Sequence, residues 1–259
     1  MADTLFSDDV SMEKNEFVCT LTLRRPPENF VDARLIVSLA TAMESLDQDP
    51  DCRVVVLASE GKHFCAGADL ARRVATPAAQ GQRHIYEEAS RLVRTRKPVI
   101  AAIQGAAIGA GLGLALVADF RVGCEQTRLS ANFNRQGYYP GFGLTFTLPR
   151  LVGRQQAAWM FYSGQRLKGH EALAIGLIDR LVAAEDLMNA ARAMASEIAA
   201  SGPLAVQATR SRLRADIEVG FVQAVAHEMK AQDGLRMTHD FQEGVRAMNE
   251  RRMPIFREE

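Results

Sequence analysis

The stretch Lys97–Phe120, KPVIAAIQGAAIGAGLGLALVADF, decides the fold of this chain. Pro98 comes directly before Val99–Ile103, a short apolar run of the kind that forms a strand buried on both faces. Glycines follow at positions 105, 109, 111 and 113, separated only by small or apolar residues. The apolar residues after Gly111 predict a helix with almost no polar face, which must be buried. The stretch therefore predicts a strand, a glycine-rich turn and a buried helix.

The glycine-rich turn is open to two interpretations. Backbone N–H groups at the helix N-terminus could bind negative charge, or the glycines could simply let the helix pack closely. The spacing Gly109-Ala-Gly111-Leu-Gly113 departs from the G-x-G-x-x-G of dinucleotide-binding turns, and no Gly-Lys-Ser/Thr of a phosphate loop is present. The chain also lacks the G-x-S-x-G of a serine nucleophile elbow. From this turn alone, anion binding and close packing stay equally open.

Composition narrows the functional classes. A chain of 259 residues can bury a large core as one domain, possibly extended by a helical appendage. The chain has 31 basic residues (Lys and Arg) and 31 acidic residues (Asp and Glu). It therefore has no net charge that would favour binding to nucleic acid or to an anionic membrane. The four cysteines show no CxxC or zinc-like spacing, and their apolar surroundings favour a reduced, cytoplasmic setting without a metal site. The polar N-terminus lacks signal-peptide features, and the longest apolar run is too short to span a bilayer.

Strand and helix patterns alternate over most of the chain, which predicts an α/β fold. Strands are expected at 17–23, 54–57, 99–103, 120–122, 129–133 and 177–182, and helices at 32–46, 76–96, 145–151, 155–163, 169–176, 185–200, 203–215, 217–232 and 239–252. We predict an α/β core over 1–185 and a helical C-terminal region over 186–259. Loops after two successive strands should meet at one sheet edge, where such sheets bind ligands.

Two loops together resemble the paired signatures of the enoyl-CoA hydratase/isomerase (crotonase) superfamily. They are Phe64–Leu70, FCAGADL, and Lys97–Gly105 with the Gly-Ala-Gly that follows. The segments Gly169–Val182 and Glu250–Phe256 are similar to later parts of the same superfamily. The resemblance implies a crotonase-like spiral of ββα units with a C-terminal helical trimerisation region, assembled as a homotrimer or a dimer of trimers. It also implies an acyl-CoA or acyl-carrier thioester as substrate, with no cofactor beyond the coenzyme A that the substrate carries.

The resemblance assigns roles to particular residues. Two backbone N–H groups of the superfamily stabilise the thioester oxyanion, and they correspond to Ala68 and Ala110. Such donors contribute roughly 3–4 kcal/mol each to a transition state. The substrate channel should be lined by Ala66, Asp69, Leu70 and Gly109. Arg25 stands where a basic residue often meets the CoA phosphates, although a solvated surface arginine is an equally good interpretation.

The chain departs from the superfamily at its acid–base positions. Hydratases use two glutamates, and those positions are Gly113 and Phe133 here. Some relatives instead place an aspartate in the next loop, at the position of Gly141. Because general acid–base groups contribute about 10²–10⁴-fold each, ordinary hydration should be very slow. Phe133 and Gly141 are then expected to line the acyl pocket without moving protons.

Decarboxylation needs an oxyanion hole and a proton donor but no base. Ser130–Gly143 is similar to the same region of the decarboxylases in polyketide β-branching, with Ala-Asn-Phe followed by Pro-Gly. Tyr138 and Tyr139 are the candidate proton donors, and the alternative for both is packing with the hydroxyl in water. Weaker candidates are His84 and Tyr86 as donors, and Asn132, Asn134 and Arg135 as ligands of a substrate carboxylate.

The sequence thus predicts an enzyme of the enoyl-CoA hydratase/isomerase type that stabilises an enolate. Decarboxylation or double-bond isomerisation is easier to support chemically than hydration. The alternative is a non-catalytic homologue that binds acyl-CoA or serves as a structural partner. RNA binding is disfavoured because the chain has no basic stripe.

Overall fold

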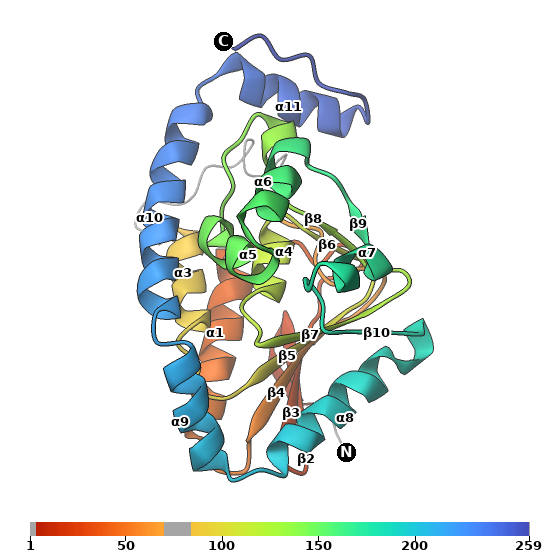
Figure 1. The fold of residues 1–259 in the computed structure, drawn as a ribbon, viewed down its shortest axis with the longest axis vertical. Helices are drawn as coiled ribbons and strands as arrows, with labels where there is room; N and C mark the ends of the chain where they lie inside the picture. Colours follow the sequence, from red (N-terminus) through yellow and green to blue (C-terminus); the bar gives the residue numbers. More distant parts are fainter. Residues whose placement is uncertain (1–3, 70–83, 259) are drawn as a thin grey trace.

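The computed structural model describes residues 4–69 and 84–258. A seven-stranded sheet has the order β1-β2-β3-β4-β5-β7-β10, and a three-stranded sheet has the order β6-β8-β9 (Figure 1). The strands of the first sheet are β1 (Thr4–Ser7), β2 (Val10–Asn15), β3 (Val18–Leu23), β4 (Val54–Ser59), β5 (Val99–Ile103), β7 (Phe120–Cys124) and β10 (Arg180–Val182). Those of the second are β6 (Ala106–Ile108), β8 (Arg128–Ser130) and β9 (Leu167–Lys168).

Helices follow most strands, as the alternating pattern predicts. They are α1 (Ala33–Gln48), α3 (Ile85–Leu92), α4 (Ala110–Ala115), α5 (Leu144–Val152), α6 (Arg154–Ser163), α7 (Gly169–Ala174), α8 (Leu187–Ala199), α9 (Pro203–Leu213), α10 (Ile217–Leu235) and α11 (His239–Asn249), with short 3₁₀ turns at Asn134–Gln136 and Ala184–Asp186. Asp32 caps α1 by accepting a hydrogen bond from the backbone N–H of Leu35 at 2.9 Å. This cap confirms the expected start of the first helix.

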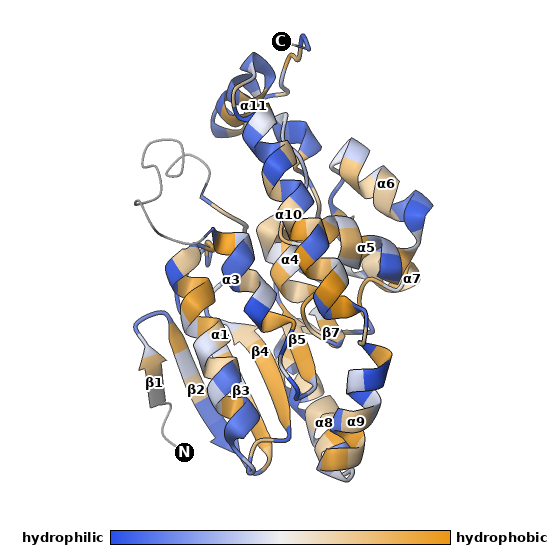
Figure 2. Cartoon of the chain, turned by 90° about the vertical axis from the view of Figure 1, so that its left-hand side faces the viewer, coloured by the Kyte–Doolittle hydropathy of each residue, from blue (hydrophilic) through white to orange (hydrophobic). Residues whose placement is uncertain are grey.

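The centre of the large sheet is parallel and covered on both faces. β3, β4, β5, β7 and β10 pair in parallel, whereas β1, β2 and β3 pair antiparallel. One face packs against α1 and α3, and the other packs against α8. β4 and β5 are therefore almost wholly apolar, and Figure 2 shows them in orange. Their continuous apolar runs are what burial on both faces requires.

Some elements differ from the expected ones. The sequence does not predict β1, β2, β6 or β9, and the strand expected at 129–133 ends at Ser130. The chain leaves the strand there because Phe133 is already in the helical region, at φ −57° and ψ −46°. The strand expected at 177–182 begins only at Arg180. The helix expected at 76–96 begins, within the described residues, at Ile85, and Leu70 lies outside the described residues.

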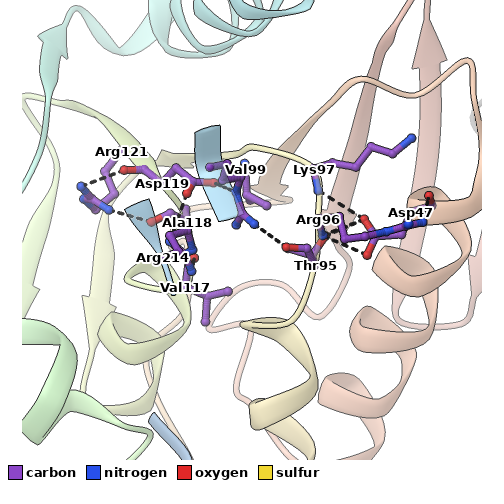
Figure 3. A network of polar contacts seen from close by, with 11 residues as sticks. Asp47, Thr95, Arg96, Lys97, Val99, Val117, Ala118, Asp119, Arg121 and Arg214 are labelled. Carbon is purple, nitrogen blue, oxygen red and sulfur yellow. Dashed lines mark hydrogen bonds and ion pairs between the residues drawn. The ribbon is translucent and has the colours of Figure 1, made fainter. Parts of the chain in front are cut away.

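A buried ion-pair network attaches α9 to the sheet (Figure 3). Asp119, which precedes β7, accepts hydrogen bonds from the backbone N–H of Val99 at 2.8 Å, from Arg210 Nε at 2.9 Å and from Arg214 Nη1 at 3.1 Å. Arg121 forms a second ion pair nearby, with Asp179 at 3.1 Å. A buried carboxylate is tolerated only when it is well paired. The ion pairs of Asp119 therefore hold α9 against the sheet.

The C-terminal helices also contact the α/β core directly. α10 runs along α3 and α5, as Figure 1 shows. The division into a core over 1–185 and an oligomerisation region over 186–259 stays a prediction. Within residues 4–69 and 84–258, no helix combines the length and the apolar character needed to cross a bilayer.

Candidate active site

Two segments distant in sequence meet beside the N-terminus of α4. The backbone N–H of Cys65 donates to the carbonyl oxygen of Ala106 at 2.9 Å, and the N–H of Ile108 donates to the carbonyl oxygen of Cys65 at 3.0 Å. A Cβ at Gly67 would lie 2.8 Å from the carbonyl oxygen of Ile108 and 4.0 Å from the backbone nitrogen of Ala110. Only glycine, here at φ +103°, permits this approach. Residues 65–68 are thereby held alongside the start of α4.

The backbone amides of Ala68 and Ala110 have no partner in the regular structure around them. Within residues 4–69 and 84–258, neither N–H donates to a backbone carbonyl. Ala110 is the first residue of α4, and its N-cap residue Gly109 supplies no capping side chain. A helix start of this kind has N–H groups that can bind a partially negative oxygen. Both alanines line one cavity, so both amides can serve the same ligand.

The cavity has a volume of about 750 Å³, which is large enough for an extended organic ligand. Its lining contains nine of the residues that the sequence singled out: Ala66, Ala68, Asp69, Tyr86, Gly109, Ala110, Asn132, Phe133 and Tyr138. The structure therefore brings most of the expected site together. Gln136 lines the cavity as well.

Tyr139 and Gly141 lie differently from what the sequence suggested. Neither is among the described residues that line the cavity. The ring of Tyr139 packs against His227, with ring centroids 5.7 Å apart, and burial together with the charge of Glu228 raises the pKa of Tyr139. The space beside Gly141 is taken by the hydroxyl group of Tyr86, which a Cβ at 141 would overlap. The ring of Tyr139 is therefore packed outside the cavity lining, and Tyr86 lines the cavity where residue 141 was expected to do so.

Arg25 is held by carboxylates rather than directed at the cavity. Its guanidinium contacts Asp9 at 2.6 Å and Asp32 at 2.8 Å, and it is not among the described lining residues. We therefore assign Arg25 to fold stability. Other cations line the cavity, namely Lys62, Arg128 and Arg166. Lys62 lies just before the FCAGAD loop, so its position in sequence could have identified it.

We expect Arg25→Met to lower stability by about 1–2 kcal/mol, because it removes the shorter of the two ion pairs of the buried Asp9 and leaves only Arg34, at 3.3 Å. The hydrogen bond from Arg25 lowers the pKa of Asp9 below its ordinary 3.8, so the pair stabilises the fold above that pH and loses its effect as the pH falls through the lowered value. Denaturation across pH 2–7 should show a flatter acid limb in the variant. An unchanged stability with a raised KM for acyl-CoA would instead place Arg25 at the ligand.

Gly113 and Phe133, where the resemblance leads us to expect the glutamates of hydratases, lie in aromatic packing. A Cβ at Gly113 would lie 2.7 Å from Cβ and 2.8 Å from Cδ1 of Phe142, a fully buried side chain. Phe133 is itself a lining residue, and its ring edge lies 3.6 Å from where a Cβ of Gly109 would be. Neither residue supplies a carboxylate, and the side chains nearest to Gly109 are the ring of Phe133 and the amide of Asn132.

Helix α10 supplies polar contacts that sequence reasoning missed. Gln232 Nε2 donates to the hydroxyl oxygen of Tyr86 at 3.1 Å, and Arg236 Nε donates to the hydroxyl oxygen of Tyr138 at 2.6 Å. The spacing of Gln232 and Arg236, four residues apart, does not by itself indicate that they contact the cavity, because their partners are far away in the sequence. The two tyrosines that line the cavity are thus both held from the C-terminal region.

Comparisons with known proteins identify the family of this chain. The profile of the family described as enoyl-CoA hydratase/isomerase matches residues 13–259. YngF of Bacillus subtilis, named for the same family, is 36% identical over 253 residues, covering 94% of this chain and 96% of the relative. Carnitinyl-CoA dehydratase of Salmonella typhi is 31% identical over 258 residues, covering 97% and 99%.

A solved structure extends the likeness to three dimensions. The crystal structure of an enoyl-CoA hydratase/isomerase from Pseudoalteromonas atlantica T6c superimposes with a TM-score of 0.89 at 26% identity, covering 96% of this chain and 100% of that chain. The expected crotonase fold is thereby confirmed. This chain belongs to the enoyl-CoA hydratase/isomerase family.

Proposed function

We propose that this protein binds an acyl-CoA thioester and stabilises its enolate with the backbone N–H groups of Ala68 and Ala110. The observation that carries the proposal is that both residues line one cavity, on segments held together by backbone hydrogen bonds. Donors fixed in this way need no reorganisation as negative charge develops on the thioester oxygen. Each can therefore supply roughly 3–4 kcal/mol to the transition state.

Decarboxylation fits the rest of the cavity best, because it needs a proton donor but no base, whereas double-bond isomerisation needs a base for the α-proton and hydration needs both an acid and a base. Addition of water needs carboxylates, and Gly113 and Phe133 offer none at the hydratase positions. In decarboxylation, the bond from the α-carbon to the carboxylate breaks, CO₂ leaves, and the electron pair forms the enolate held by the two amides. A proton donated to the α-carbon then completes the reaction.

Lys62, Arg128 and Arg166 are suited to the phosphates of coenzyme A. Lys62 and Arg166 are exposed, so they mark the end of the cavity that opens to solvent. Coenzyme A arrives as part of the substrate, and the proposed chemistry needs no further cofactor. We also propose a trimeric assembly, which would cover exposed apolar residues of the C-terminal helices such as Leu204 and Leu213.

The test is a panel of thioesters assayed with the purified protein. We expect hydration of crotonyl-CoA to be at least 10²–10⁴-fold slower than the best of malonyl-CoA decarboxylation and 3-butenoyl-CoA isomerisation, because acid–base groups of the hydration reaction are missing. Product formation followed by mass spectrometry would measure all three. Fast hydration would contradict the proposal and point to Glu28 or Asp69, the carboxylates that do line the cavity. Binding of every thioester without turnover would favour a non-catalytic acyl-CoA-binding protein.

A further inference from the structure

Helix α10 directs a row of three polar side chains at the site loop. Glu228, Gln232 and Arg236 are spaced four residues apart, which places them on one face of the helix. Glu228 and Gln232 are 0% and 1% exposed. Polar groups buried this deeply need specific hydrogen-bond partners, and among the described residues the Nε2 atom of Gln232 has them whereas its Oε1 atom has none.

All three side chains bind residues 138–145 or a lining tyrosine. Glu228 accepts hydrogen bonds from the backbone N–H groups of Gly143 at 2.7 Å and Thr145 at 3.0 Å. Gln232 Nε2 donates to the carbonyl oxygen of Tyr139 at 2.9 Å, besides its bond to Tyr86. The row formed by Glu228, Gln232 and Arg236 therefore fixes the loop that carries Tyr138 and Tyr139. Arg236 is the last residue of this row.

The contacts separate the two neighbouring tyrosines. Tyr138 is 3% exposed, lines the cavity and receives the hydrogen bond from Arg236. Its ring also packs on Phe241, with ring centroids 4.8 Å apart. Tyr139 contributes only its backbone carbonyl to the row, and its ring lies against His227. Of the two, only Tyr138 combines access to the ligand with a fixed orientation.

We propose that Tyr138 is the proton donor to the enolate carbon and that Arg236 is the residue that positions it. The inference rests on the proposed function. The enolate electron pair takes the proton of the Tyr138 hydroxyl: a C–H bond forms, the O–H bond breaks, and a phenolate remains that regains its proton from water. Arg236 donates an N–H to the hydroxyl oxygen at 2.6 Å and thereby fixes the position of the hydroxyl group. The same guanidinium stabilises the negative charge that develops on the phenolate.

The experiment is a double-mutant cycle on the fastest reaction of the thioester panel. We expect Tyr138→Phe to lower kcat on the order of 10²-fold with little change in KM. As a single variant, Arg236→Met should lower kcat. Added to Tyr138→Phe, it should cause no further loss, because Arg236 acts through Tyr138. Arg236→Lys, which keeps the positive charge, should restore part of the loss. Tyr162→Phe, on a tyrosine that is 75% exposed, is the matched control.

The possible outcomes distinguish a failure of the donor assignment from a failure of the proposed function. Unchanged kcat in Tyr138→Phe, or a loss in Tyr139→Phe instead, would overturn the assignment of the donor while the proposed function stands. Independent, multiplicative losses in the double variant would show that Arg236 does not act through Tyr138. If the wild-type protein neither converts the panel nor exchanges the α-protons of butyryl-CoA with D₂O, the proposed function fails and this inference fails with it. Melting temperatures of all variants separate these effects from misfolding.

Discussion

Ala110→Pro should lower kcat about 10²–10³-fold while leaving the protein folded, because it removes one of the two amide donors to the thioester oxygen. Ala110 is the first residue of α4, and proline is favoured at the first position of a helix, where its missing N–H has no intrahelical partner. The substitution therefore deletes the donor with little cost to the helix. Steady-state kinetics with the best thioester of the panel would measure the loss.

Ala110→Gly is the matched control for this variant. Glycine keeps the N–H, so turnover should stay near that of the wild type. Ala110→Asp should abolish activity by a different route, since its carboxylate would place a like charge beside the developing oxyanion. Full turnover in the proline variant, with an unchanged melting temperature, would remove the Ala110 amide from the mechanism.

The second large effect is expected at Gly113. Gly113→Glu should lower the free energy of unfolding by about 3 kcal/mol or more, and it should not restore hydration of crotonyl-CoA. The new Cβ would lie 2.7 Å from Phe142, whose ring is fully buried and cannot move without disturbing the core. Chemical denaturation and a crotonyl-CoA hydration assay would measure the two parts of the prediction.

A double variant tests whether Phe142 is the cause. Phe142→Ala alone should cost about 3–5 kcal/mol through the cavity that it leaves. If the two side chains compete for one space, Gly113→Glu combined with Phe142→Ala should be more stable than the sum of the single losses predicts. Undiminished stability of Gly113→Glu would show that a glutamate reaches the cavity without displacing Phe142.

Much of the fold could be predicted because its signals are local. The buried runs of β4 and β5 and the glycine-rich start of α4 depend on neighbouring residues only, and the structure confirms them. β2 could not be predicted in the same way. Four of the six residues of its sequence VSMEKN are polar, and it is a strand because it pairs with β3 along its whole length, from Val10 opposite Leu23 to Asn15 opposite Val18.

The candidate site was predictable where backbone groups form it and less so where side chains do. Ala68 and Ala110 follow from the two loop signatures, and the structure places both at the cavity. The different surroundings of Tyr138 and Tyr139 could not be predicted from the local sequence, since they depend on Arg236, almost a hundred residues later. The replacement of residue 141 by the Tyr86 hydroxyl is likewise a contact between distant segments, as is the ring of Phe142 beside Gly113.

A crystal structure with a bound, unreactive acyl-CoA such as butyryl-CoA would test the central claim most directly. We predict that the thioester oxygen lies about 2.7–3.1 Å from the backbone nitrogens of both Ala68 and Ala110, the range expected for oxyanion donors. A thioester bound in the same cavity with its oxygen directed at any other group, or with only one of these amides in reach, would contradict the account.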